Sequence, residues 1–262
     1  MNTPSGTIRY GARAPEAQRN REVEATAAKI WSTAVTVIWE TDPDVIKAVL
    51  PPPLEPSEPR ARIRFATVDM GTGIPVFGAG WFGVRARHGN VEGEYALFMP
   101  MTTEQATIGG RETYGEPKKI GAVAIDVEGD QVRASFARMG FTLAELSGTL
   151  GAPIEIAPKD KVDFYFKCSP SPDGKGFDTE PALVHCRRHE EARDGRAIDG
   201  TLQLLESPLD PIVDIPVGPI ISMEFARVAT TQTGEVVERV PADNLLPFVH
   251  QRYDDLSVLG KK

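Results

Sequence analysis

The stretch AVAIDVEGDQVRASF, residues 122–136, decides the fold class of this chain. Two runs rich in β-branched and small apolar residues, 122–127 and 132–136, are typical of strands. Glu128-Gly129-Asp130 lies between them, and a glycine-containing turn of this length joins antiparallel strands in a hairpin. The stretch therefore predicts two neighbouring antiparallel strands.

Strand-like runs recur on both sides of this hairpin. Asp163-Phe164-Tyr165-Phe166-Lys167 alternates polar and aromatic residues, the pattern of a half-buried strand. Tight turns are predicted at Asp173-Gly174 and Asp194-Gly195, and the second turn joins two strands. The predicted strands besides the hairpin lie at residues 61–68, 81–87, 95–101, 163–167, 182–192 and 196–205 and within residues 24–39.

Helical stretches are few. Asp42-Pro43 supplies an N-cap followed by proline at the first helical position, and Pro51 ends this short helix. Further helices are predicted at residues 103–112, 141–146 and 244–253. About ten strands with turns at short spacing predict a mainly β chain of the α+β class, folded as an antiparallel barrel or sandwich.

Length and composition predict a single domain, residues 23–262, behind a flexible polar arm, residues 1–22. With 262 residues, 41% of them hydrophobic, the chain is long enough to bury a large core. The net charge of −8 argues against nucleic acid and membrane surfaces as partners. The chain has neither a run of about 18 apolar residues nor a secretory signal, so we expect a cytoplasmic protein with Cys168 and Cys186 reduced.

The most informative chemical feature is the pair Lys118-Lys119 after Pro117. An amine attacks a carbonyl only when it is neutral, and a lysine with an ordinary pKa is protonated at neutral pH. Desolvation in an apolar pocket or repulsion from an adjacent ammonium lowers that pKa. Taken alone, a lysine pair after a turn is more often a solvated surface feature.

The wider sequence favours the chemical interpretation. The run GGRETYGEPKKIG, residues 109–121, resembles the lysine motif of the acetoacetate decarboxylase-like superfamily, in which Gly-Arg-Glu precedes Pro-Lys-Lys. Further blocks resemble that family in the same order and with similar spacing over roughly residues 33–230. They lie at residues 41–42, 49–55, 91–95, 202–204 and 211–217.

The resemblance implies a fold and a site. The fold is an antiparallel β cone or barrel around a dry cavity, with a few short helices, and homo-oligomers are usual. Lys118 would form a Schiff base with the substrate, and the charge of Lys119 would lower its pKa. No cofactor is implied, and an isolated His185-Cys186 and His189 without a second Cys/His cluster do not predict a metal site.

Two departures from the decarboxylase pattern alter the expected reaction. Decarboxylases resemble one another in an arginine and a glutamate whose positions fall here near Ser32 and Ala79. Serine cannot hold a carboxylate as a bidentate arginine does, and alanine cannot transfer a proton. The chain therefore resembles the branch of the superfamily that uses the imine for aldolase-dehydratase chemistry on pyruvate-like keto acids.

Other groups must then supply acid and base catalysis. We expect Glu116, Glu112 and Tyr253 to be catalytic, and Arg111 and Tyr114 to bind substrate. Simpler alternatives are that Glu116 is an exposed carboxylate, that Glu112 and Arg111 form a structural ion pair, and that the ring of Tyr253 only packs.

The predicted function is a Schiff-base lyase that joins a keto acid to an aldehyde. One alternative is a decarboxylase of acetoacetate or a related β-keto acid. The other is a binding protein that keeps the cavity without the reaction. The sequence leaves open the substrates, the pathway and the oligomer size.

Overall fold

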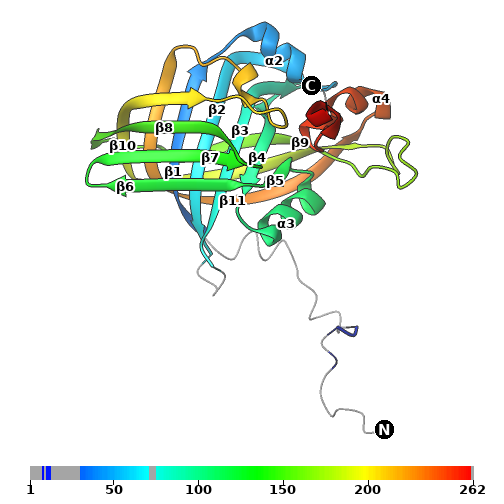
Figure 1. Ribbon diagram of the computed structural model, residues 1–262, viewed down its shortest axis with the longest axis horizontal. Helices are drawn as coiled ribbons and strands as arrows, with labels where there is room; N and C mark the ends of the chain where they lie inside the picture. Colours follow the sequence, from blue (N-terminus) through cyan, green and yellow to red (C-terminus); the bar gives the residue numbers. More distant parts are fainter. Residues whose placement is uncertain (1–7, 9, 13–29, 71–74, 261–262) are drawn as a thin grey trace.

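The computed structural model describes residues 8, 10–12, 30–70 and 75–260 (Figure 1). The predicted N-terminal arm and the start of the domain at residue 23 fall almost entirely outside the described residues. The first long element is β1 (Ile30–Glu40). In the described part of the chain, no helix is both long and apolar enough to cross a membrane.

Seven strands close into a barrel in the order β11, β1, β2, β3, β4, β9, β10. The barrel closes because β10 pairs with both β9 and β11. Six of the seven contacts between neighbours are antiparallel, and β4 with β9 is the parallel one. The predicted mainly β barrel is thus confirmed. Its strands are β1, β2 (Glu55–Asp69), β3 (Phe77–His88), β4 (Val91–Met101), β9 (Lys159–Lys167), β10 (Ala182–Leu204) and β11 (Ile220–Arg239).

Three further strands, β6 (Ala122–Glu128), β7 (Gln131–Arg138) and β8 (Phe141–Pro153), extend the sheet from the second half of β10. The predicted hairpin is confirmed, since Glu128 pairs with Gln131 across a turn in which Gly129 has φ 61°. The helix predicted at residues 141–146 is wrong. That segment pairs with β7 on one side and β10 on the other, and this tertiary pairing overrides its local helical preference.

The predicted turn at Asp194-Gly195 is also wrong, because β10 continues through it. Arg193 pairs with Arg227 but Arg196 pairs with Phe225, so β10 contains one extra residue there. Such a β-bulge bends a strand without ending it. Asp194 takes φ 55°, and both residues have the character of a turn, which explains the misleading sequence signal.

The apolar core lies between the outer face of the barrel and the β6–β8 layer, which crosses it in Figure 1. Phe65 of β2 and Phe136 of β7 have ring centroids 4.3 Å apart. A Cβ at Gly80 of β3 would overlap the Phe136 ring, so this position must be glycine for the layers to meet. Side chains alternate along a strand, so Arg64 and Ala66, which flank Phe65 in the sequence, point into the barrel.

Short helices complete the fold. The predicted helix after Asp42 is α2 (Pro43–Val49), and the Asp42 side chain accepts a hydrogen bond from the Asp44 amide as its cap. The helix predicted at residues 103–112 is α3 (Glu104–Tyr114), which leads into β5 (Lys118–Ile120) beside β4. The remaining elements are η2 (Ile212–Asp214), α4 (Ala242–Leu245), η3 (Leu246–Gln251) and η4 (Leu256–Gly260).

Replacing Phe136 with alanine tests this two-layer packing. The ring is fully buried, so Phe136→Ala should lower the free energy of unfolding by about 3–5 kcal/mol in urea titrations. The control is Phe141→Ala at the start of the next strand. The side chain of Phe141 is 40% exposed, so this change should cost less than about 1 kcal/mol. Equal losses for the two variants would contradict the assignment of the core.

Candidate active site

The end of α3 places Lys118 at the barrel. Gly115 terminates the helix with φ 80°, and its amide donates to the Arg111 carbonyl at 3.1 Å. Pro117 follows, and Lys118 then pairs in parallel with Met99 of β4. The Lys118 side chain is only 14% exposed. The sequence therefore brings this amine to the barrel on a short, fixed loop.

Glu116 is the immediate partner of Lys118. Its Oε2 lies 2.7 Å from Lys118 Nζ, and its side chain is 1% exposed. A Cβ at Gly110 would overlap both groups, so the pair lies directly against the backbone of α3. Burial favours a raised pKa for Glu116, but the charges of Lys118 and Arg188 outweigh it and hold the pKa below its usual range.

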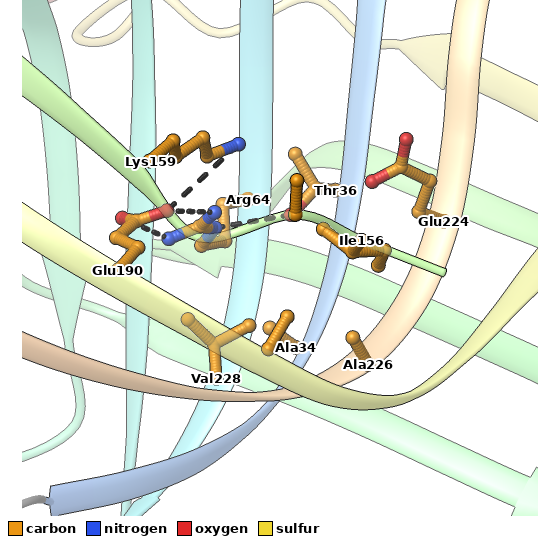
Figure 2. Close-up of a pocket in the computed structure, with 11 residues that line it drawn as sticks. Ala34, Thr36, Arg64, Ile156, Lys159, Glu190, Glu224, Ala226 and Val228 are labelled. Carbon is orange, nitrogen blue, oxygen red and sulfur yellow. Dashed lines mark hydrogen bonds and ion pairs between the residues drawn. The ribbon is translucent and has the colours of Figure 1, made fainter. Parts of the chain in front are cut away.

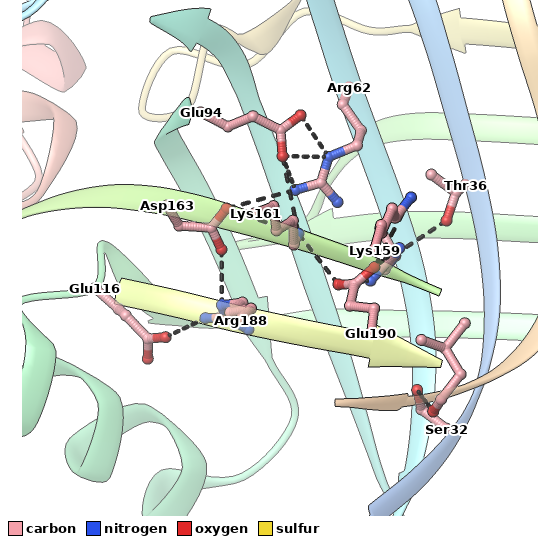
Figure 3. Close-up of polar contacts among 12 residues, drawn as sticks. Ser32, Thr36, Arg62, Glu94, Glu116, Lys159, Lys161, Asp163, Arg188 and Glu190 are labelled. Atoms are coloured by element: carbon pink, nitrogen blue, oxygen red, sulfur yellow. Dashed lines mark hydrogen bonds and ion pairs between the residues drawn. The ribbon is translucent and has the colours of Figure 1, made fainter. Parts of the chain in front are cut away.

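Arg188 of β10 connects this pair to the barrel interior. Its Nη2 lies 2.9 Å from Glu116 Oε1 and donates to the Tyr165 hydroxyl at 3.0 Å. Its Nε lies 2.7 Å from Asp163 Oδ2. Burial raises the pKa of Tyr165 well above its usual value, so its hydroxyl stays protonated. Figure 3 shows these contacts as a chain that runs from Glu116 through Arg188 of β10 to Asp163 of β9.

Beyond Asp163, ion pairs continue deeper into the barrel (Figure 3). Arg62 of β2 donates from Nε and Nη2 to the carboxylate of Glu94 at 2.6–3.0 Å and stacks 3.7 Å above the Trp81 ring. Lys161 Nζ lies 3.7 Å from Asp163 and 3.8 Å from Glu94. Burial favours the neutral form of Glu94, but Arg62 and Lys161 lower its pKa to about 2.

The chain of ion pairs ends at Glu190 of β10. Arg64 of β2 donates to both Glu190 oxygens at 2.7 and 3.0 Å and to the Thr36 hydroxyl at 3.0 Å. Lys161 Nζ lies 3.2 Å from Glu190 as well. Since β2 and β10 are not neighbours in the sheet, the contact between Arg64 and Glu190 must cross the barrel interior.

The barrel interior is therefore lined by charged side chains. Within the described part of the barrel, five cationic and four anionic side chains of this network are each at most 15% exposed. With every group ionised, one positive charge is left over. The nine side chains are Arg62, Arg64, Lys118, Lys161, Arg188, Glu94, Glu116, Asp163 and Glu190.

Little space remains around the far end of this network. A cavity of about 20 Å³ lies between Thr36, Arg64, Glu190 and the small residues of β1 and β11 (Figure 2). That volume suits about one water molecule. A larger cavity, of about 470 Å³, is lined in part by Lys161, Arg188 and Gln232, and Arg188 is the residue that contacts Glu116.

Comparison with known proteins identifies the family. A model of the acetoacetate decarboxylase family matches residues 13–240. The chain belongs to this family. An acetoacetate decarboxylase from Chromobacterium violaceum is 29% identical over 210 residues, which cover 77% of this chain and 84% of that protein. The family resemblance inferred from the lysine motif is thereby confirmed.

Solved structures share the fold. A structure of an acetoacetate decarboxylase matches with a TM-score of 0.71 at 21% identity, covering 81% of this chain and 90% of that one. The enduracididine biosynthesis enzyme MppR, in complex with the condensation product of pyruvate and imidazole 4-carboxaldehyde, matches with a TM-score of 0.68 at 17% identity. That match covers 79% of this chain and 87% of MppR. Membership of the acetoacetate decarboxylase family supports a lyase-type enzyme for small keto acids.

Of the predicted site residues, the structure brings Glu116 directly to Lys118 and places Tyr114 near Glu116. Glu116 forms the ion pair described above. Tyr114 is half-buried at the edge of the site, where its ring packs against Gly234 of β11, and burial raises its pKa. Both residues lie within four positions of Lys118, where a motif in the sequence can locate them.

The other predicted residues point elsewhere. Lys119 projects from the opposite face of β5 into an ion-pair cluster, with Nζ 2.7 Å from Asp210 and 3.0 Å from Asp254. The Arg111 guanidinium donates to the Lys118 carbonyl at 2.9 Å and stacks on the ring of Tyr253. Glu112 is exposed on α3. In this arrangement, none of these four side chains contacts Lys118 Nζ.

The structure also explains the two departures from the decarboxylase pattern. Ser32 donates its hydroxyl to the Val228 carbonyl at 3.1 Å, and Ala79 lies on β3 opposite Ala66. The arginines of the interior come instead from β2 and β10, namely Arg62, Arg64 and Arg188. Within the described residues, no three His, Cys, Asp or Glu side chains are placed to hold a metal ion.

Sequence analysis missed Arg188, Asp163 and Tyr165. Their signal is the alternation of side chains along β9 and β10, of which the sequence analysis used only residues 163–167, as the pattern of a half-buried strand. In a closed barrel, the same period of two places those residues in the interior. Charged residues at alternate positions of a strand whose other face is aromatic are therefore candidates for a barrel site.

Glu94 makes the network sensitive to acid. Its folded-state pKa of about 2 lies below its usual value of 4.5, so its contribution to stability is complete above pH 4.5 and is lost as the pH falls towards 2. Glu94→Gln should lower the free energy of unfolding by about 3–5 kcal/mol at pH 7, because it leaves Arg62 buried without its carboxylate. Chemical denaturation measured between pH 7 and 3 should show the difference from wild type shrinking below pH 4.5.

The matched control for this prediction is Glu92→Gln on the same strand. The side chain of Glu92 is 54% exposed and lies 3.8 Å from Arg85, so its loss should change stability by less than about 1 kcal/mol. A Glu94→Gln deficit that stays constant down to pH 3 would show that the ion pair with Arg62 is not the source of the stability.

Proposed function

We propose that this protein is a Schiff-base lyase for small keto acids, in which Lys118 forms an imine and an aldehyde is the second substrate. The observation that carries the proposal is the buried contact of 2.7 Å between Lys118 Nζ and Glu116 Oε2. An imine forms from a neutral amine, so the proton on Nζ must leave, and Glu116 is the acceptor beside it.

The first stage is imine formation. Lys118 passes a proton to Glu116, and Nζ then adds to the keto carbon of the substrate. Glu116 returns that proton to the former carbonyl oxygen and then relays a second proton from Nζ to the same oxygen. The oxygen leaves as water, which gives a positively charged iminium and restores the carboxylate of Glu116. The iminium occupies the place of the lysine ammonium, so the carboxylate of Glu116 again faces a cation.

Arg188 is suited to the substrate carboxylate. It is buried between Glu116, Asp163 and Tyr165 at the entrance to the charged interior. A guanidinium binds a carboxylate through paired N–H donors, the role that Ser32 cannot fill. The single positive charge left over in the network also favours one carboxylate in this site.

The second stage uses the iminium as an electron sink. Glu116 removes a proton from the carbon next to the iminium, and the resulting enamine attacks the aldehyde carbon to form the new carbon–carbon bond. The proton passes from Glu116 to the aldehyde oxygen, and water then hydrolyses the iminium and releases Lys118. Loss of the new hydroxyl as water before hydrolysis gives the aldol-dehydration product.

Decarboxylation is the second candidate, favoured by the name of the Chromobacterium violaceum relative. It uses the same iminium but takes the electrons from a departing carboxylate instead of a C–H bond. That route needs no base to remove a carbon-bound proton, whereas the aldol route does. The position of Glu116 beside Nζ therefore favours the aldol route, as does the ligand in the MppR structure.

Reductive trapping tests the imine. With pyruvate and borohydride, the intact mass should increase by one reduced pyruvate, and peptide mapping should place the label on Lys118. Lys118→Arg should abolish the label, whereas Lys119→Arg keeps the cation between Asp210 and Asp254 and should still take it up. A folded wild-type protein that acquires no label with pyruvate or acetoacetate would support the non-catalytic binding alternative.

Deuterium exchange tests the base. In heavy water the wild-type enzyme should exchange the methyl protons of pyruvate, and Glu116→Gln should slow this exchange by roughly 10²–10⁴-fold. Glu112→Gln, on the exposed face of α3, is the matched control and should leave the exchange unchanged. Fast release of carbon dioxide from acetoacetate without methyl exchange in pyruvate would favour decarboxylation instead.

A further inference from the structure

The segment that follows η3 lies against the loop that carries Lys118. Arg252 reaches into this loop, where Nη1 donates to the carbonyls of Gly115 at 2.5 Å and Glu116 at 3.4 Å. Its Nη2 donates to the carbonyl of Arg111 at 3.4 Å. One guanidinium therefore ties the last turn of α3 to the loop that follows it.

Arg111 completes this contact from the other direction. Its Nη1 donates to the Lys118 carbonyl at 2.9 Å and to the Arg252 carbonyl at 3.3 Å. The ring of Tyr253 lies 5.0 Å from the Arg111 guanidinium and 5.7 Å from that of Arg252. Burial and the nearby charge of Arg252 lower the pKa of Arg111, so the two cations oppose each other and are held by the carbonyls and the ring.

Asp254 holds the residue on the other side of Lys118. Its Oδ1 accepts from Lys119 Nζ at 3.0 Å, and its carboxylate accepts from Arg138 at 2.5 and 3.1 Å. Asp210 bridges the same two cations at 2.7 Å each. Arg252 thus fixes the backbone just before Lys118, and Asp254 fixes the side chain of Lys119 just after it.

We propose that residues 252–254 act as a clasp that positions Lys118 and Glu116 for imine formation. The proposal rests on the proposed function and assigns Arg252 and Asp254 as positioning residues, since neither side chain touches Lys118 Nζ. A shift of about 1 Å in a reacting group can reduce a rate about 10²-fold, so fixing this loop is a requirement of the chemistry. Lys119 then serves the site by anchoring β5 to the clasp.

The principal experiment removes the guanidinium group of Arg252. Arg252→Met keeps the length of the side chain and should slow borohydride trapping of pyruvate roughly 10–100-fold, with millimolar guanidinium restoring part of the rate. The matched control, Arg239→Met, removes an exposed arginine that donates to the Glu180 carbonyl, and it should trap at the wild-type rate. An Arg252→Met protein that traps at the wild-type rate would overturn the clasp.

Hydrogen exchange gives a readout that does not depend on the reaction. Amides of residues 115–120 should exchange faster in Arg252→Met and in Asp254→Asn, while those of β1, which residues 252–254 do not contact, stay at wild-type rates. If wild type fails to trap any keto acid, the proposed function fails, and faster exchange limited to residues 115–120 still supports the clasp. Unchanged exchange there in both variants would refute it. Should Arg252→Met fail to fold, Arg252→Lys and Asp254→Asn provide the same two measurements.

Discussion

Charge inside a closed barrel is the constraint on which the rest of the structure depends. The outward face of the barrel packs against the β6–β8 layer and α2 or meets solvent, but the inward face of a closed barrel excludes water wherever side chains fill it. Every cation in that interior must lie against a carboxylate, because an unpaired buried charge costs several kcal/mol. The positions of Arg62, Arg188 and Glu94 follow from this requirement for mutual neutralisation.

Stability alone does not account for such an interior. Buried ion pairs are often no more stabilising than well-packed apolar residues of similar volume, because desolvation offsets their attraction. The network also supplies a fixed electric field at its end nearest Lys118. Arg188 keeps Glu116 ionised and oriented, and Glu116 in turn faces Lys118. The amine of Lys118 is thus the last member of a chain of ion pairs that begins at Arg64, on the far side of the barrel.

The sequence predicted those parts of the molecule that depend on local patterns. The hairpin around Gly129, the cap at Asp42 and the loop holding Lys118 follow from turn chemistry, capping and a motif. Features that depend on the closure of the sheet into a barrel could not be predicted from local patterns. The polar positions of β9 have the same spacing whether they face water or the barrel interior, and Asp194-Gly195 has the same composition in a bulge as in a turn. Lys119 shows the same limit, since adjacency in sequence placed two ammonium groups together, whereas a strand directs them to opposite faces.

The same field bears on the choice between the two reactions. When Glu116 takes a proton from carbon, it loses its negative charge, and Arg188 loses one of its partners. A keto acid that keeps its carboxylate through the reaction supplies a replacement anion at that moment, so the interior stays neutral while the enamine exists. In decarboxylation the substrate carboxylate disappears together with the charge of the iminium, no base removes a proton from carbon, and the enamine then takes a proton at carbon before hydrolysis. Glu116 beside Nζ thus serves imine formation on both routes, but only the aldol route uses this base again, to remove a proton from carbon.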